Sequence, residues 1–242
     1  MINKCPGQDT QFWKPNDIYN VDCPQCGKSI EFFKDDIRRR CEKCGHTLFN
    51  PKLNLGCARW CQFTEQCVGA IGKDEFKEIL TLAMKEYYGD DKGRIDKALK
   101  VLRTAEDILE RENGNAKVVI AASMLYDIGV HDLEKNFETD KEFDQEKYNL
   151  PSVQDILERS GSKKKLIDEV CHIIGNHRHP QKFNTSNANI VYDAIHIVNF
   201  KDEKTFENTK RLKRIINQGF FTASGKEIAK QAYLYATRST KN

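Results

Sequence analysis

Two pairs of cysteines constrain this chain of 242 residues more than any other feature. Cys23 and Cys26 form one C-x2-C pair, Cys41 and Cys44 form the other, and a glycine follows each pair. Two tight knuckles of this kind bring four thiolates into a tetrahedron around a metal ion. The run between them, "SIEFF", is typical of a short strand. We therefore predict a closed, structural zinc site (or iron in the same cage) that stabilises a module too small to fold by apolar burial alone.

A second set of cysteines follows at irregular spacing. The segment "LGCARWCQFTEQCVG" carries Cys57, Cys61 and Cys67, and Cys5 lies upstream in "KCPGQD". Four thiolates at irregular spacing, with tryptophan and phenylalanine side chains nearby, suit a [4Fe–4S] cluster shielded from water. A second zinc ion and free structural thiols remain open as alternatives. The ninth cysteine, Cys171, is expected to be a small buried hydrophobic residue.

The overall composition limits the class of protein. The chain is 39% hydrophobic and 31% charged, with a formal charge of +3, as in soluble globular proteins with a real core. It has no apolar run long enough to cross a bilayer and no apolar core of a signal peptide near its start. We expect a cytoplasmic protein, where cysteine clusters indicate metal more often than disulfides. Acids lie near the basic clusters "DDIRRRCEKC", "SKKKL" and "TKRLKRI", so a nucleic-acid surface is not favoured over solvated faces.

The sequence predicts two domains, a cysteine-rich metal-binding module over residues 1–72 and an all-helical domain over residues 73–242. Apolar residues recur at helical spacing throughout the second part, and no strand pattern alternates there. The segment "NAKVVIAASMLYDIG", residues 115–129, is apolar nearly all round and should be the buried central helix, ending at its glycine. The expected fold class is mainly α, with short β-strands confined to the N-terminal module. The further helices are expected over residues 74–89, 93–113, 151–161, 163–180, 187–200, 203–217 and 225–238.

The order of these helices resembles a known superfamily. A helix with "RI–x–x–AL–x–V–L", a buried helix ending "DIG", a "G…I–x–x–V–x–x–II–x–x–H" helix and then "VYDA" span nearly all of residues 90–200. This succession is similar to that of the HD superfamily of metal-dependent phosphohydrolases. The N-terminal segments "CPGQDT" and "NPKLNLGCARWC" are similar to those of HD-domain proteins that carry a zinc-ribbon-like head.

The resemblance implies a metal site in which His, a His-Asp pair and a distal Asp hold a divalent cation such as Mn, Fe or Zn. In this chain the first histidine matches Lys97, the pair matches Tyr126 and Asp127, and the distal acid matches Asp193. A lysine ammonium has no lone pair for a metal, and a neutral phenol is a poor ligand. The site is therefore degenerate. We expect the Lys97 ammonium to stand between the two carboxylates as a buried ion pair, whose loss would strongly destabilise the domain.

Histidines offer a competing prediction. Members of the superfamily with two metals add histidines in this interval, where His131, His172, His177 and His179 lie, and His131 and His177 fit best. With the two aspartates they would supply enough ligands for a displaced cation that activates water against a phosphate ester. His196, on an apolar helix, is expected to be a packing residue.

Three functions are compatible with these patterns. The favoured one is an HD-like scaffold with weak or no hydrolytic activity, used with its metal-binding head for binding or sensing a small phosphorylated ligand or a partner protein. The second is an active metal-dependent phosphohydrolase on phosphomonoesters or nucleotides, using Asp127, His131, His177 and Asp193. The third is a zinc-ribbon adaptor for nucleic acid or protein, using Arg38, Arg39 and Arg40 between the knuckles.

Overall fold

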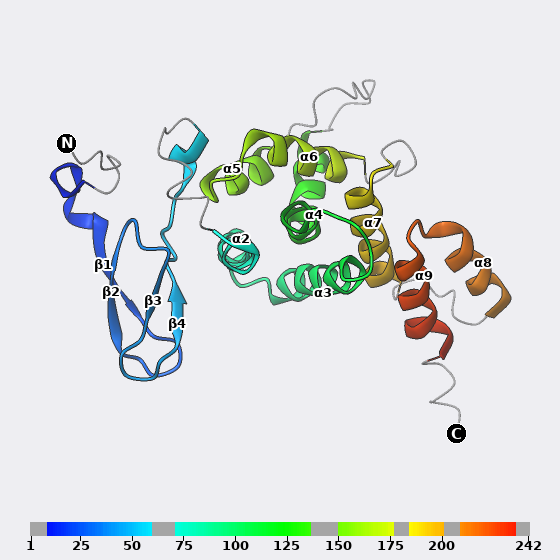
Figure 1. Cartoon of the computed structure of the whole chain (residues 1–242), viewed down its shortest axis with the longest axis horizontal. Helices are drawn as coiled ribbons and strands as arrows, with labels where there is room; N and C mark the ends of the chain where they lie inside the picture. Colours follow the sequence, from blue (N-terminus) through cyan, green and yellow to red (C-terminus); the bar gives the residue numbers. More distant parts are fainter. Residues whose placement is uncertain (1–8, 60–70, 137–149, 177–183, 201–208, 236–242) are drawn as a thin grey trace. The chain divides into compact units, whose positions relative to one another are not determined.

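The computed structural model describes residues 9–59, 71–136, 150–176, 184–200 and 209–235. The chain divides into two compact units: residues 1–82 with 158–163, and residues 83–157 with 164–242. The division therefore falls ten residues later than the boundary expected after residue 72, and the first unit also takes a short segment from the helical part. The chain is mainly helical, with short strands only in its N-terminal part among the residues described, as the sequence predicts (Figure 1).

The elements follow one another as short helical turns and strands, then helices. The first group is η1 (Thr10–Phe12), η2 (Pro15–Asp17), β1 (Ile18–Asp22), β2 (Ser29–Phe33), β3 (Arg38–Arg40), β4 (Thr47–Phe49) and η3 (Gly56–Arg59). The second is α2 (Lys73–Tyr88), α3 (Lys92–Leu109), α4 (Ala116–Asn136), α5 (Pro151–Arg159), α6 (Lys164–Gly175), α7 (Ser186–Asn199), α8 (Thr209–Gly219), α9 (Ala223–Lys230) and the π-helical turn η7 (Gln231–Tyr235).

The N-terminal unit contains two small antiparallel hairpins. Strand β1 pairs with β2, and β3 pairs with β4. Their shared interior holds Phe32 and Leu48 together with Cys23 and Cys41, all of them buried. Two buried large apolar side chains, with the half-buried Tyr19, Val21 and Ile30 around them, are too few to stabilise these hairpins against the entropy of folding, so a further cross-link is needed.

Asn50 joins the two hairpins by hydrogen bonds. Its side-chain amide donates to the carbonyl oxygens of Phe33 and Asp36 at 3.1 and 2.8 Å. Its side-chain oxygen accepts from the Tyr19 hydroxyl and from the backbone N–H of Lys52. Because Asn50 is only 3% exposed, these bonds form away from water and fix the connection from β2 to β3.

The helical unit is built around α4. Its residues from Val118 to Leu125 are buried on every side, and α3, α6 and α7 pack against it (Figure 1). The prediction of a buried central helix is confirmed. No helix in the described part of the chain is both long and apolar enough to span a membrane.

The sequence predicted that this helix ends at Gly129, but α4 continues to Asn136. A β-carbon built on Gly129 would overlap the Ile174 side chain of α6 and would lie 3.3 Å from Val153 of α5. The glycine is therefore explained by the close approach of neighbouring helices rather than by a turn.

Replacing Gly129 by alanine tests this explanation. The added methyl group has to displace Ile174, so we expect the free energy of unfolding to fall by about 1–3 kcal/mol. Chemical denaturation of the full chain measures this change. The matched control is Gly93→Ala near the start of α3, where the new methyl group would meet only an aspartate oxygen of Asp91 at 3.5 Å. That variant should be neutral or slightly more stable, and equal losses in both would contradict the packing explanation.

Candidate metal centre and the Asp127 cluster

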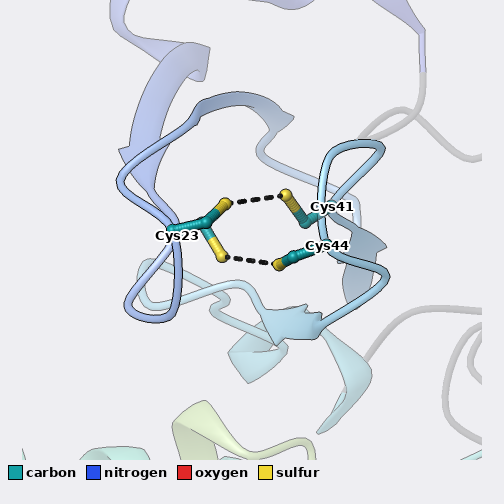
Figure 2. Close-up of side chains that lie close together, drawn as sticks. Cys23, Cys41 and Cys44 are labelled. Carbon is teal, nitrogen blue, oxygen red and sulfur yellow. Dashed lines mark hydrogen bonds between the residues drawn. The ribbon is translucent and has the colours of Figure 1, made fainter.

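The four knuckle cysteines converge in the N-terminal unit. The sulfurs of Cys23 and Cys44 are 3.6 Å apart, as are those of Cys26 and Cys41, and all four ligand atoms lie within 4.8 Å of one another. Figure 2 shows the labelled side chains directed toward a common centre. Zinc–sulfur bonds of about 2.3 Å place tetrahedral sulfurs about 3.8 Å apart, whereas a disulfide would need about 2.05 Å. The four sulfurs therefore fit one metal ion, although their geometry does not distinguish zinc from iron.

The two knuckles share one backbone design. The N–H of Gly27 donates to the Cys23 carbonyl, and the N–H of Gly45 donates to the Cys41 carbonyl, each at 2.8 Å. The glycines have φ angles of 68° and 75°, in the left-handed region that side chains disfavour. Each turn thus presents two sulfurs on the same side. Because each knuckle is the turn of one hairpin, a metal bound by all four sulfurs links the two hairpins.

Electrostatics in this group favours a cation. Backbone N–H groups, chiefly that of Cys44, lower the pKa of the Cys41 thiol to about 6. The N–H of His46 likewise favours a thiolate at Cys44, but desolvation and the sulfurs of the other three cysteines raise its pKa to about 12. One thiolate therefore opposes the formation of another. A divalent cation removes that conflict, because all four sulfurs must be deprotonated to bind it.

The second set of cysteines is only partly within the described residues. Cys57 is exposed in η3, whereas Cys5, Cys61 and Cys67 lie outside the part of the chain that the structure describes. The choice between an iron–sulfur cluster, a second zinc and structural thiols therefore stays a prediction. Cys171 is buried in α6, as expected.

In the helical unit, Asp127 lies within a cluster of cationic and phenolic side chains. The Lys97 Nζ is 3.7 Å from one carboxylate oxygen, and the guanidinium of Arg94 is 3.8 Å from the other. The Tyr88 hydroxyl donates to that second oxygen at 3.3 Å. Burial, and then the charge of Asp127, raise the pKa of Tyr88 well above its ordinary value, so the phenol stays protonated and remains a donor. We call Tyr88, Arg94, Lys97 and Asp127 the Asp127 cluster.

The prediction of a buried Lys97 ion pair is wrong. The side chain of Lys97 is 40% exposed and that of Asp127 is 24% exposed. Both cations also lie beyond hydrogen-bond distance of the carboxylate. Because water screens such pairs, each contributes at most about 1 kcal/mol. Lys97 therefore neutralises the charge of Asp127 without being an essential part of the core, and its loss should not strongly destabilise the unit.

Asp193 is held by protein groups of the α8–α9 connection. It is completely buried in α7 and accepts from the backbone N–H groups of Phe221 and Thr222 at 3.0 and 2.8 Å, and from the Thr222 hydroxyl at 2.7 Å. Thr222 in turn caps α9 by accepting from the N–H of Gly225. Burial raises the pKa of Asp193 although these three bonds act in the opposite direction. Within the described residues its contacts join α7 to α9, and none joins it to Lys97.

Of the four predicted histidine ligands, only His172 has a described side chain. Among those residues, the cysteine set is the only group of three or more side chains placed to hold a metal. His172 is exposed on α6. The side chain of His131 and all of His177 and His179 lie outside the description, so their role stays a prediction. Tyr126 is half-buried next to Asp127 on α4.

The three arginines of β3 and His196, which the sequence singled out, contact other residues of the protein. Arg38 pairs with Glu75 at 3.1 Å, Arg39 pairs with Asp36 at 2.6 Å, and Arg40 donates to the Gly45 carbonyl at 3.2 Å. The guanidinium groups are thus engaged within the N-terminal unit. His196 packs among Tyr192, Phe200 and Phe220 with ring centroids 5.1–5.7 Å apart, which agrees with its expected packing role.

Two members of the Asp127 cluster were not found from the sequence. Arg94 lies three residues before Lys97, and this spacing places both on one face of a helix, so the pair was a detectable signal. Tyr88 belongs to the preceding helix and gave no local signal, because only tertiary structure brings it to Asp127. The bonds from Thr222 to Asp193 span 29 residues and were equally undetectable.

Removing the metal should unfold the N-terminal unit selectively. We expect the purified chain to hold at least one zinc ion, and Cys41→Ser to lose one zinc per chain. Chelation should change the fluorescence of Trp13, whose ring lies 5.6 Å from Phe33 of β2. Elemental analysis and fluorescence measure both effects, with Cys171→Ser as the control that keeps its metal. Unchanged zinc content in Cys41→Ser would contradict the assignment.

Asp193 and Asp127 should differ sharply in their contribution to stability. Asp193→Ala leaves buried donors of Thr222 and Phe221 without an acceptor, and we expect a loss of about 3 kcal/mol. Asp127→Ala removes a half-exposed pair and should cost less than about 1 kcal/mol. Denaturation of both variants in the absence of added metal provides the comparison. Equal losses would show that the Asp127 cluster matters more to folding than its exposure implies.

Comparison with known proteins gives no relative for this chain. No family model, no curated protein and no solved structure matches it. The arrangement of its own residues therefore has to carry any functional conclusion.

Proposed function

We propose that the protein is a non-catalytic binding protein, with a zinc-binding head and an HD-like helical unit that binds a small phosphorylated ligand without hydrolysing it. The observation that carries the proposal is the pair of cations at Asp127. Where the resemblance implies a histidine ligand, Lys97 places an ammonium 3.7 Å from the carboxylate. An ammonium repels a divalent cation and offers it no lone pair, so it disfavours metal at this position.

The exposure of the cluster supports ligand binding. The side chains of Arg94 and Lys97 are 46% and 40% exposed. The Nε of Arg94 pairs with Asp91 at 3.4 Å. The terminal guanidinium nitrogen of Arg94 and the Lys97 ammonium lie 3.8 and 3.7 Å from Asp127, beyond hydrogen-bond distance, so these donors can bind an incoming phosphate. Arginine and lysine are the usual phosphate-binding side chains, and charge-assisted bonds of this kind are strong. Asp127 limits the affinity by its own negative charge, and it keeps the two cations close together.

The head has a different task in this proposal. Four thiolates fill the coordination sphere of zinc and leave no open position for a substrate. The metal therefore stabilises the two hairpins rather than acting on a ligand. Because each of the three arginines of β3 already has an intramolecular partner, an adaptor role through these arginines is less well supported than ligand binding by the helical unit.

The proposal separates binding from hydrolysis in one set of measurements. Nucleoside monophosphates and inorganic phosphate serve as probes in calorimetry, and phosphate release is assayed with Mn, Fe(II) or Zn added. We expect binding without release. The double variant Arg94→Ala/Lys97→Ala should bind at least about tenfold more weakly, since it loses two charge-assisted contacts. Asp127→Ala should bind more tightly, because the carboxylate no longer repels the phosphate.

The same helix provides a matched control. Lys100 and Arg103 are also exposed cations three residues apart on α3, and replacing both by alanine should leave phosphate binding unchanged. Release of phosphate that requires added metal and disappears in Asp127→Ala would instead establish the metal-dependent phosphohydrolase. Equal weakening in both double variants would show that the net charge of α3, and not the Asp127 cluster, attracts the probe.

A further inference from the structure

Positive charge is concentrated at the C-terminal end of the helical unit. Residues 209–242 contain eight lysines and arginines and a single acid, Glu227. Since the whole chain has a formal charge of +3, the remaining 208 residues contain four more acids than bases. Such a difference in net charge between two parts of one chain is typical of a segment that binds a polyanion.

Helix α8 directs its polar side chains outward. Leu212 and Ile216 are 2% and 0% exposed, and α8 packs against α9 and η7. On the opposite side, Lys213 and Arg214 are exposed together with Asn217 and Gln218. Figure 1 shows α9 between α7 and α8. The apolar side of α8 is thus covered by protein, while its cationic side faces solvent. We call this side, with the exposed side chains of Lys213, Arg214, Asn217 and Gln218, the α8 face.

Four cations of this region have described side chains, and none of them meets an acid in the described part of the chain. Lys213, Lys226 and Lys230 form no ion pair with any residue that the structure describes. Arg214 donates its Nε to the side-chain oxygen of Gln218 at 3.2 Å, which orients the guanidinium without neutralising it. The next acids along the sequence belong to residues 201–208, outside the described part. Within the described residues, no acid therefore neutralises Lys213 or Arg214 on the α8 face.

The placement of these cations is unfavourable for the helix alone. Lys210 and Arg211 belong to the first turn of α8, which contains no acid, and the helix dipole disfavours positive charge at that end. Natural proteins break such local rules chiefly at functional sites.

We infer that the α8 face binds the phosphate backbone of a nucleic acid. Phosphate contacts require cations and amide groups, and the described exposed side chains of this face are two cations and two amides. An acidic protein partner is a weaker fit, because protein interfaces depend on aromatic and apolar anchors and these four side chains supply none. Insertion into a lipid surface is disfavoured as well, since the apolar side of α8 is buried.

Binding of nucleic acid by α8 does not depend on the ligand proposed at Asp127, because Asp127 belongs to α4. It also differs from an adaptor role of the N-terminal unit, because the cations concerned belong to the last helices. It revises the expectation that the basic run in α8 is only a solvated face.

The test uses the full-length, zinc-loaded chain and a short fluorescent single-stranded RNA, with a DNA duplex of similar length for comparison. We expect binding whose affinity falls steeply as salt rises. The variant Lys213→Gln/Arg214→Gln should bind at least about tenfold more weakly at low salt, and its dependence of log Kd on log salt should be less steep by about one per cation removed. Its thermal stability should not fall, because like-charge repulsion is relieved.

A control with the same loss of charge decides whether the α8 face is responsible. Lys164 and Lys165 are adjacent exposed lysines at the start of α6, and Lys164→Gln/Lys165→Gln should keep wild-type affinity and salt dependence. Equal weakening in the two variants, or no binding of either probe by the wild type, would overturn the inference. Preferential retention by vesicles of anionic lipid at the same salt would overturn it as well and would indicate a membrane surface.

Discussion

The burial of α4 on all sides is the constraint on which the helical unit depends. A helix that is apolar all round must be enclosed, so α3, α6 and α7 are arranged around it. Its one glycine sits where the Ile174 side chain of α6 leaves no room for a β-carbon. The same burial limits where polar chemistry can occur. Asp127 lies toward the end of the buried run and reaches half-exposed partners, whereas residues one or two turns earlier on α4 meet only the interior.

The two aspartates assigned to one site by resemblance have different environments. Asp127 is near solvent and lies at ion-pair distance from two cations, so keeping its carboxylate ionised costs little free energy. Asp193 is fully buried and is stabilised by three hydrogen bonds from a single connection. A buried carboxylate without such donors would be costly. Within the described residues, the first acid belongs to a partly exposed cluster of charged side chains, and the second belongs to the framework.

Local patterns predicted much of this structure. The cysteine spacing and the following glycines predicted both knuckles, and helical periodicity predicted the central helix. The resemblance, rather than a local pattern, placed Lys97 between Asp127 and Asp193; it lies 3.7 Å from Asp127, whereas the described contacts of Asp193 come from Phe221 and Thr222. Local patterns failed where partners come from distant segments. The exposure of Lys97, the phenol of Tyr88 and the fixing of Asp193 by Thr222 depend on tertiary packing. The role of Gly129 was misread, because a glycine in a close helix contact and one in a turn look alike in sequence.

The hydrogen bonds from Thr222 to Asp193 have a consequence for the last two helices. They attach the start of α9 to the middle of α7, and α9 carries α8 on its other side. A basic segment at the end of a chain is often a tail that reaches in any direction, but here the cationic helix has a fixed orientation with respect to the helical body. A strand bound along α8 would consequently run at a defined angle to α7. The hydrogen bonds between Thr222 and Asp193 thus fix the orientation of the exposed cations of α8 relative to α7.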